Sequence, residues 1–313
     1  MKHIQLLLIG LITISWLSCS RQQKKDTTKV KVMVWNILHG GKNKSLPKDG
    51  RPDVISIIKE SKADVVMMIE TYGASDTIAA ALNYHHQLIS SNLCIYSKYP
   101  ITKKLVFPDS ISTFNFGGVQ LDVNGKPLLV FDTWLHYLPD TRLVPLEKTE
   151  AEILAWENAG TRDNEVRTII NTIQSYTENA DSIPVLIGGD LNSHSHLDWT
   201  TATKGMYNHG NAVVNWTVSK TLTTAGYTDS FREAHPDPTK NIGSTWLAVT
   251  KNGVEEFSRK DRIDYLYYKG KKLTNISSES YAAPFNQPCK YGTKTYSNFP
   301  SDHGFVITTF ELE

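Results

Sequence analysis

The sequence predicts a single α/β domain with two β-sheets flanked by helices. Segments with the periodicity of strands alternate with segments of helical periodicity along the whole chain. No linker, low-complexity stretch or internal repeat divides the 313 residues. We therefore expect a single catalytic domain over residues 29–313.

The first third of the chain alternates between strand and helix signals. Lys29–Ile37 is rich in β-branched residues and predicts a strand, while Asp64–Ile69 is a continuous apolar run typical of a buried central strand. Between them, Pro52–Lys62 carries apolar residues at helical spacing. Leu93–Tyr96 and Leu105–Phe107 are predicted as further strands.

The rest of the chain contains one hairpin signal and five more elements. Gly118–Val123 and Leu128–Trp134 alternate in polarity around Asn124-Gly125, and both of these turn residues tolerate positive φ. The other predicted elements are helices at Glu147–Trp156 and Arg162–Tyr176 and strands at Pro184–Ile187, Arg262–Tyr268 and Phe305–Phe310.

The N-terminus has the pattern of an export signal. Lys2 and His3 precede the apolar run Ile4–Leu17, which is short for a membrane-spanning helix and has the length of a secretory signal. The segment Leu17-Ser18-Cys19 and the polar stretch after it resemble a bacterial lipoprotein signal. Trp16 departs from that pattern, which usually has an aliphatic residue there. The alternatives are a plain cleaved signal peptide or an uncleaved anchor.

The lipoprotein resemblance implies an anchored, exported protein. Residues 1–18 would be removed, Cys19 would become the lipidated first residue, and residues 19–28 would form a flexible tether. We therefore expect a lipoprotein of the outer or cell membrane that faces the periplasm or the cell exterior. Cys94 and Cys289 lack the spacing of a zinc site; an export compartment permits a disulfide between them, and two separate thiols are an equal alternative.

The bulk charge argues against a protein dedicated to long polyanions. Lys plus Arg total 33 and Asp plus Glu total 32, for a formal net charge of +1. Nucleic-acid binding depends heavily on basic contacts to phosphates, so a nucleic-acid partner is possible but not favoured. Small phosphate esters are not excluded.

Polar residues stand where the predicted buried strands end. Open α/β sheets place ligand sites at such ends, although a single polar residue there is usually a cap or a turn former. A carboxylate inside a buried strand, as at Asp264, costs free energy unless it has a partner. The residues in this position are Asn36, Glu70, Asp190, Asn192, Asp264, Asp302 and His303.

Six segments together resemble the endonuclease/exonuclease/phosphatase superfamily, which includes DNases, exonuclease III-like nucleases, neutral sphingomyelinases and inositol polyphosphate 5-phosphatases. They occur in the order of that family and cover nearly all of the mature chain. The segments are VMVWNIL, DVVMMIE, FDTWLHY, GGDLNS, RIDYLYY and SDHGFVI. The resemblance implies a four-layer α/β sandwich, with two mixed β-sheets packed face to face and the site at one edge of the sheets.

The resemblance also implies a metal site. Glu70 corresponds to the main metal ligand of the family, and Asn36 and Asp302 support it directly or through water. Oxygen ligands of this kind suit Mg²⁺ or Mn²⁺.

The resemblance implies catalytic roles for the remaining residues. His303 would contact the scissile phosphate, and Asp264 would hold its other ring nitrogen and favour the imidazolium. Asp190 would orient or deprotonate the attacking water, and Asn192 would hold that water or a phosphate oxygen.

His136 resembles the second histidine of the family, which stabilises developing charge or protonates the leaving group. The family usually has a polar-His-Leu segment here, whereas this chain reads Thr133-Trp134-Leu135-His136, so the register can shift. A satisfied polar residue at a strand end is the alternative interpretation.

The segment Asn192–Trp199 is unusual in polarity. His194, His196 and Asp198 alternate, and alternate residues of an extended segment share a face, so a second metal site is conceivable. We favour a substrate-pocket loop with Trp199 packed beneath it, to which His39 contributes near the first strand end. Trp246 is interpreted as a core aromatic more readily than as a stacking platform.

These observations predict a monomeric, lipid-anchored phosphoesterase that uses a divalent metal to hydrolyse a small or lipid-linked phosphate ester by in-line attack of water. An extracytoplasmic DNase or RNase of the same superfamily is the first alternative. A non-catalytic surface-binding protein on the same fold is the second. A serine hydrolase is disfavoured because the chain has no G-x-S-x-G segment.

Overall fold

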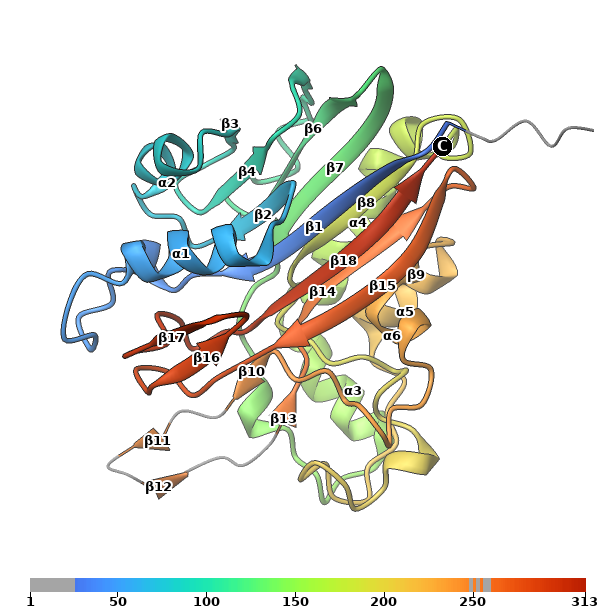
Figure 1. Cartoon of the computed structure of the whole chain (residues 1–313). Helices are drawn as coiled ribbons and strands as arrows, with labels where there is room; N and C mark the ends of the chain where they lie inside the picture. Colours follow the sequence, from blue (N-terminus) through green and yellow to red (C-terminus); the bar gives the residue numbers. More distant parts are fainter. Residues whose placement is uncertain (1–25, 248–249, 252–253, 256–259) are drawn as a thin grey trace, which may run out of the picture.

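Two six-stranded β-sheets, packed face to face, form the centre of the molecule (Figure 1). The structure is a computed structural model that describes residues 26–247, 250–251, 254–255 and 260–313. The first sheet has the strand order β15 (Leu273–Tyr281), β18 (Phe305–Leu312), β1 (Thr28–Asn36), β2 (Val65–Ile69), β4 (Leu93–Ser97) and β3 (His85–Leu88). The second has the order β5 (Ile101–Lys104), β6 (Phe116–Val123), β7 (Lys126–Trp134), β8 (Val185–Asp190), β14 (Asp264–Lys269) and β9 (Thr228–Asp229).

Both sheets are mixed. Strand β1 runs parallel to β2, and β7 runs parallel to β8, whereas the other pairings within the two sheets are antiparallel. The pairing of β1 with β18 brings the first and the last strand of the two sheets together in the middle of the first sheet. The central strands of both sheets therefore pair with a neighbouring strand along each of their two edges.

Strand β1 shows why the sheets pack as layers. Val30, Val32 and Val34 belong to the apolar core between the two sheets, while the alternate residues Met33 and Trp35 face the opposite way, toward the helices. All five side chains are fully buried. Because successive side chains point to opposite faces of a strand, a run that is apolar at every position must be covered on both faces.

Helices cover the outer face of each sheet. Helices α1 (Arg51–Ser61) and α2 (Ser75–Leu82) pack on the first sheet, and α4 (Arg162–Thr177) and α5 (Thr217–Thr224) pack on the second. The resulting order is helix, sheet, sheet, helix. The predicted four-layer α/β sandwich is confirmed.

Shorter elements lie around the edges of the sandwich. The remaining helical segments are α3 (Glu150–Asn158), α6 (Ser230–Ala234), η1 (His39–Gly41), η2 (Thr141–Leu143) and η3 (Thr201–Thr203). Three two-stranded ribbons pair β10 (Trp246–Leu247) with β13 (Lys260–Asp261), β11 (Thr250–Lys251) with β12 (Val254–Glu255), and β16 (Cys289–Tyr291) with β17 (Lys294–Tyr296). Figure 1 shows the first two ribbons at one end of the sandwich, beyond the N-terminal end of β18.

The structure confirms the predicted hairpin and corrects one predicted strand. Asn124 and Gly125 have φ of 56° and 85° between β6 and β7, as the turn requires. Leu105–Phe107 is not a strand, because the preceding residues form β5 and the chain leaves the sheet at Leu105, before Pro108. Apolar side chains at Leu105 and Phe107 pack on the outer core of the second sheet rather than in a strand.

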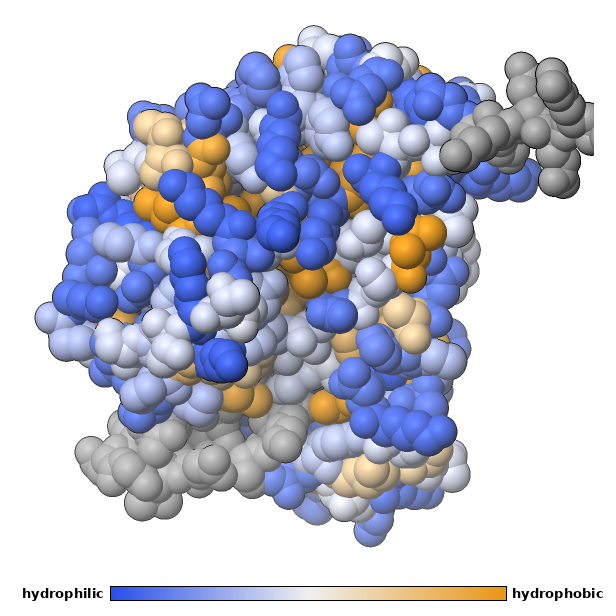
Figure 2. All heavy atoms as spheres, in the orientation of Figure 1, coloured by the Kyte–Doolittle hydropathy of each residue, from blue (hydrophilic) through white to orange (hydrophobic). Residues whose placement is uncertain are grey.

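The expectations for residues 1–18 and Cys19 lie outside the described residues. Strand β1 already begins at Thr28, the last residue of the expected tether. In the described part of the chain, no helix is long and apolar enough to cross a membrane. Cys94 is buried and Cys289 is half-buried, and both are free thiols, so the structure contains no disulfide between them. Figure 2 shows a mainly hydrophilic face with apolar residues scattered in small patches.

Candidate active site

The predicted site residues meet at one edge of the sandwich because the strands that carry them end or begin there. Asn36 is the last residue of β1, and it pairs with Ile69, directly before Glu70. Asp190 ends β8 and pairs with Asp264, the first residue of the antiparallel strand β14. The loop before β18 reaches the same edge, since β18 runs antiparallel to β1.

Two glycines allow Asp190 to reach this position. A Cβ on Gly188 would lie 2.7 Å from Cγ2 of Val34 in the facing sheet. Gly189 has a φ of +149°, and a Cβ there would lie 1.8 Å from the carbonyl oxygen of Thr133 on the neighbouring strand β7. Larger residues would separate β8 from both neighbours, so the close approach of backbones requires glycine.

His303 is held in place by Asp264 and by two hydrogen bonds of its own backbone. Its Nδ1 lies 3.0 Å from Oδ2 of Asp264, and its Nε2 lies 3.8 Å from Oδ2 of Asp190. Nε1 of Trp35 donates to the carbonyl oxygen of His303, while the backbone N–H of His303 donates to Oγ of Ser301, both at 3.0 Å. That Oγ donates in turn to the backbone carbonyl that ends β1, at 2.7 Å. The ring is therefore oriented with Nε2 toward Asp190.

Neighbouring carboxylates set the protonation of this group. Burial lowers the pKa of His303, but Asp264 and Asp190 raise it by more, so it lies well above its ordinary value. Burial raises the pKa of Asp190 to about 7, although the positive charge of His303 opposes the shift. The site thus combines an imidazolium with a carboxyl group that exchanges its proton near neutral pH.

Glu70 is positioned by amide and backbone donors. Nδ2 of Asn36 donates to Oε1 of Glu70 and to Oδ2 of Asp190, both at 3.1 Å. The backbone N–H of His39 donates to Oε2 of Glu70 at 3.0 Å. Glu70 has a φ of 59°, and its own N–H is held by Oδ1 of Asn92 at 3.0 Å. Such backbone strain in a non-glycine residue persists only where the surroundings fix it, and it is concentrated at functional sites.

Asp302 has a buried oxygen that the protein leaves without a partner. Within the described part of the chain, Oδ1 of Asp302 is buried and has no hydrogen-bond partner. Burial raises the pKa of Asp302, His303 opposes this shift, and the negative charge of Glu70 raises it further. A divalent cation would satisfy that oxygen and the neighbouring carboxylate. Glu70, Asn36 and Asp302 supply the hard oxygen ligands that Mg²⁺ and Mn²⁺ prefer.

A second set of side chains is also close enough to hold a cation. Asp190, Asp264 and His303 each offer a ligand atom within 4.8 Å of the other two. His303 and Asp264 are already joined by a hydrogen bond, and a positively charged imidazolium does not bind a cation. The donor chemistry therefore favours Glu70, Asn36 and Asp302 as the metal side of the site.

The predicted residues face a cleft of about 220 Å³. One part of its lining consists of Glu70, Asp190, Asn192, Asp302 and His303. The backbone N–H of Asn192 donates to Oδ1 of Asp190 at 3.0 Å, and its Nδ2 donates to the carbonyl oxygen of Leu135 at 2.9 Å. Asn192 therefore connects the end of β8 to the segment that follows β7.

The rest of the lining comes from residues without a predicted catalytic or binding role. It consists of Trp134, Tyr137, Asp140, Thr141, Arg142 and Trp246. Trp246, expected in the core, is half-buried and lines the cleft instead. Trp134 and Tyr137 belong to the segment FDTWLHY, where only His136 had a predicted role. No motif marked Asp140, Thr141 or Arg142, because these residues reach the cleft through the position of a loop rather than through a strand end.

His136 is not among the residues that line the cleft. Its Nδ1 accepts the backbone N–H of Leu138 at 3.2 Å, and its ring lies 4.9 Å from that of Tyr137. Its own N–H donates to Oε2 of Glu165 at 2.9 Å. Trp134, two residues earlier, is the residue that pairs with Asp190 in the sheet. The role predicted for His136 remains a prediction.

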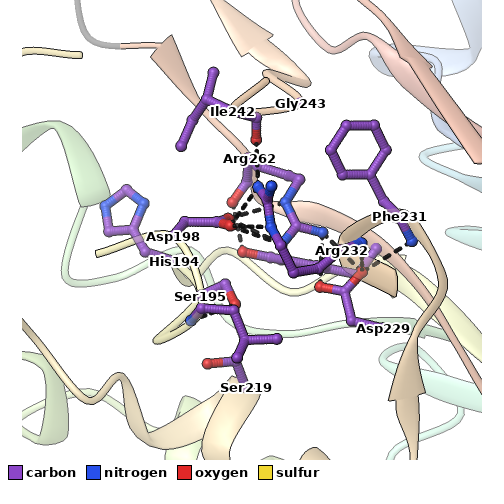
Figure 3. Close-up of polar contacts among 12 residues, drawn as sticks. His194, Ser195, Asp198, Ser219, Asp229, Phe231, Arg232, Ile242, Gly243 and Arg262 are labelled. Atoms are coloured by element: carbon purple, nitrogen blue, oxygen red, sulfur yellow. Dashed lines mark hydrogen bonds and ion pairs between the residues drawn. The ribbon is translucent and has the colours of Figure 1, made fainter. Parts of the chain in front are cut away.

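Within the predicted pocket loop, Asp198 belongs to a buried charge network and is not part of the cleft lining. Figure 3 shows dashed lines that join the carboxylate of Asp198 to both Arg232 and Arg262. Its Oδ1 accepts Nη2 of Arg232 at 2.6 Å, and its Oδ2 accepts Nε of Arg262 at 2.9 Å. Arg262 also pairs with Asp229, with Nη1 and Oδ2 at 2.7 Å. All four charged residues are buried, which explains the carboxylate of Asp198 as one half of a charge network.

The histidines of this loop are also engaged elsewhere. His194 is buried, its ring lies 4.8 Å from the rings of both Trp199 and Trp216, and its Nδ1 lies 3.6 Å from Oδ1 of Asp261. Nδ1 of His196 lies 2.8 Å from Oγ of Ser219. His194, His196 and Asp198 do not gather around a common point and do not line the cleft.

His39 lies beside the metal side of the site but points its ring elsewhere. Its backbone holds Glu70, while its exposed ring stacks on Tyr72 with centroids 5.8 Å apart. His39 is not part of the cleft lining. The structure thus gives this residue a backbone contact to Glu70 and leaves the predicted contact with substrate untested.

Comparison with known proteins connects this geometry to one family. A sequence model of the Endonuclease/Exonuclease/phosphatase family matches residues 33–303. The uncharacterized protein F14F9.5 of Caenorhabditis elegans is 28% identical over 327 residues, which cover 98% of each chain.

Two solved structures share the fold. An endonuclease/exonuclease/phosphatase family protein from Bacteroides thetaiotaomicron has a TM-score of 0.59 at 13% identity, over 92% of this chain and 99% of that chain. TDP2 of D. rerio, complexed with a single-strand DNA product, has a TM-score of 0.60 at 14% identity, over 90% of this chain and 99% of that chain. At these identities the likeness shows a common fold alone.

Proposed function

The chain belongs to the endonuclease/exonuclease/phosphatase family, and we propose that it is a divalent-metal-dependent phosphoesterase that hydrolyses a small or lipid-linked phosphate ester. The contact between His303 and Asp264, at 3.0 Å, is the observation that carries the proposal. This contact supports an imidazolium in a cleft that is also lined by Glu70 and Asp302, whose carboxylates suit a cation. Positive groups beside a phosphate stabilise the negative charge that develops during ester hydrolysis.

The cation is assigned to Glu70, Asn36 and Asp302. When bound, Mg²⁺ or Mn²⁺ supplies positive charge that stabilises the phosphate oxygens during attack. The hydrogen bonds from Asn36 and from the backbone of His39 keep the Glu70 carboxylate oriented before any ligand arrives. A fixed carboxylate costs little reorganisation when the cation binds.

Asp190 is the proton acceptor of the reaction. It takes a proton from water as the water oxygen attacks phosphorus, the bond between phosphorus and the ester oxygen breaks, and the leaving oxygen takes a proton from solvent water. His303 holds a non-bridging phosphate oxygen through Nε2–H. Asp264 keeps the ring charged and oriented, and Asn192 positions the water or a phosphate oxygen beside Asp190.

A nuclease activity is the second candidate. The cleft is lined by Trp134, Tyr137 and Trp246, and aromatic rings of this kind stack on the bases of single strands. TDP2 of D. rerio, which shares the fold, is complexed with single-strand DNA. The net charge of +1 opposes this candidate, because affinity for long polyanions requires many basic contacts.

A substrate panel tests both candidates. The purified full-length chain is assayed with bis-p-nitrophenyl phosphate, p-nitrophenyl phosphate, sphingomyelin, inositol phosphates and plasmid DNA, each with Mg²⁺, with Mn²⁺ and with EDTA. Hydrolysis of a small ester that is lost in EDTA supports the proposal. Plasmid nicking that exceeds every other activity favours the nuclease. Inactivity on the whole panel supports a non-catalytic binding protein instead.

We also propose that the chain is an exported lipoprotein attached through Cys19. The support is the sequence of residues 1–25 alone. Expression in a bacterium with a radiolabelled fatty acid should label the wild-type chain and not the Cys19→Ala variant. Equal labelling of both chains, or of neither, contradicts lipidation at this residue.

A further inference from the structure

We propose that Arg142 is a catalytic residue of this cleft, whose guanidinium contacts the phosphate group and stabilises negative charge that develops on the leaving-group side. This inference rests on the proposed phosphoesterase function and adds a residue that no sequence motif indicated.

Arg142 is placed where a phosphate group would lie. It belongs to η2 and lines the cleft together with Glu70, Asp190 and His303. Among the described residues of that lining, Arg142 is the only arginine or lysine. It is therefore the permanent positive charge of the cleft, since a guanidinium keeps its proton at every physiological pH.

Two neighbours fix the guanidinium. Nε of Arg142 lies 3.0 Å from Oδ1 and 2.9 Å from Oδ2 of Asp140, and Asp140 also accepts the backbone N–H of Arg142 at 2.9 Å. On another side, the guanidinium carbon lies 5.3 Å from the ring centroid of Trp246, within range of a cation–π contact. A charge fixed in this way costs little reorganisation when an anion binds.

Stability does not explain this arrangement. The side chain of Arg142 is 38% exposed and that of Asp140 is 22% exposed. Ion pairs with such access to water contribute little to the free energy of unfolding. Positioning of the guanidinium over the cleft accounts for the pair better than a contribution to folding does.

The balance of charge in the cleft also favours an anion-binding role. Four carboxyl groups, those of Glu70, Asp140, Asp190 and Asp302, line the cleft. A phosphate ester adds further negative charge. The hydrogen bond to Asp140 raises the pKa of Arg142, burial opposes this shift, and the negative charge of Asp302 adds a smaller rise. A cation at Glu70 and the guanidinium of Arg142 would both place positive charge beside a phosphate in the same cleft.

The structure leaves this role to Arg142 rather than to His136. The residue that pairs with the catalytic base in the sheet is Trp134, and an indole ring has no positive charge. His136 lies outside the cleft lining, with its Nδ1 accepting the N–H of Leu138. The cation that the family pattern predicts near this strand end is therefore supplied from η2, a few residues further along the chain.

Phosphate binding and turnover together test the inference. Inorganic phosphate is titrated calorimetrically into the full-length chain saturated with Mg²⁺, for the wild type and for Arg142→Ala, Arg142→Lys and Arg167→Ala. Arg167 is the matched control, since it is an arginine paired with an aspartate, Asp163, and is 47% exposed outside the cleft. Kinetics on the best ester follow, with and without added guanidinium chloride.

We expect Arg142→Ala to weaken phosphate binding and to lower kcat, each by about ten- to a hundredfold, which corresponds to one lost charge-assisted contact. Added guanidinium should restore part of kcat in Arg142→Ala and have no such effect on the wild type. Arg142→Lys should fall between the wild type and Arg142→Ala because lysine keeps the charge without the planar fork. Arg167→Ala should match the wild type in both measurements.

Several results would overturn the inference. One is phosphate affinity and kcat of Arg142→Ala within about twofold of the wild type, and another is a larger loss in His136→Ala than in Arg142→Ala. Absence of phosphate binding by the wild type in Mg²⁺ would also contradict it. A wild type that hydrolyses no ester but binds phosphate in an Arg142-dependent way refutes the phosphoesterase proposal and leaves the anion site standing.

Discussion

His303 and Asp264 come from different sheets and meet at 3.0 Å across the edge of the sandwich. His303 precedes β18 of the first sheet, whereas Asp264 begins β14 of the second. The geometry of the dyad therefore depends on how the two sheets pack. The buried core between the sheets, rather than a single flexible loop, keeps the imidazole and the carboxylate together.

Asp264→Asn tests whether the carboxylate keeps His303 charged. The amide preserves the shape but removes the negative charge, so the pKa of His303 should fall and turnover should drop by about two orders of magnitude or more. A histidine titration by NMR measures the first effect, and kcat on the best ester measures the second. An unchanged titration of His303 would show that Asp264 has no part in its protonation.

The pH dependence of turnover follows from Asp190 and His303. Asp190 must be deprotonated to accept a proton, so activity should rise with pH through its pKa, about 7 before a cation binds. A bound cation lowers that pKa, so the ascending midpoint should lie at or below neutrality. His303 must be protonated, and its pKa is raised well above the ordinary value, so activity should fall only at higher pH.

The check is a pH profile of kcat/KM in saturating Mg²⁺ for the wild type and for Asp190→Asn. The variant should be much slower and should lose the ascending limb, because an amide has no proton to lose in this range. A profile of Asp190→Asn that keeps the ascending limb would assign the base to another group.

Asp198→Asn should reduce stability rather than substrate binding. Removal of this charge leaves Arg232 and Arg262 without their main partner inside the protein, and loss of one partner of a buried ion pair costs about 3–5 kcal/mol. Urea unfolding measures the change. Asp181→Asn is the control, because its ion pair with Lys271 is exposed and its removal should leave the midpoint unchanged.

A different result for Asp198→Asn would revive the pocket-loop interpretation. That result is an unchanged unfolding midpoint combined with a raised KM. It would mean that Asp198 contacts substrate and that its contacts with the two arginines do not stabilise the fold.

Gly189→Ala should lower the stability of the fold and displace the proposed catalytic base, Asp190. A methyl group would meet the backbone oxygen of Thr133, so β8 must move and Asp190 with it. We expect a lower free energy of unfolding, by about 1–3 kcal/mol, and a lower kcat. Gly125→Asn is the control, since a side chain at Gly125 has nothing within 4 Å and asparagine tolerates positive φ. Equal stability of the wild type and Gly189→Ala would contradict the close packing described at this strand.

Much of the site could be predicted because it is encoded at strand ends. Asn36, Glu70 and Asp190 each follow a buried apolar run, and the carboxyl ends of neighbouring parallel strands meet at one edge. Asp264 and His303 begin or precede antiparallel strands and so reach the same edge. For these residues, the local sequence and the sheet topology both predict a position at the same edge of the sandwich.

The parts of the site that the sequence did not predict depend on loops that come together only in the folded protein. The alternative of a second metal site at His194, His196 and Asp198 assumed an extended segment, whereas the structure shows turns at this point and the three side chains contact different neighbours. Arg142 and Trp246 lie far apart in sequence and meet at 5.3 Å only because η2 and β10 flank the same cleft. No periodicity or spacing in the sequence predicts such a contact.

The most direct test of the phosphoesterase account is the turnover of His303→Ala and Glu70→Ala on the best ester of the panel, in Mg²⁺ and in EDTA. Each variant is first shown to keep the circular dichroism spectrum and unfolding midpoint of a folded chain. The account predicts Mg²⁺-dependent turnover for the wild type and a loss of at least about two orders of magnitude in each variant. Near-normal turnover in either folded variant would contradict the account.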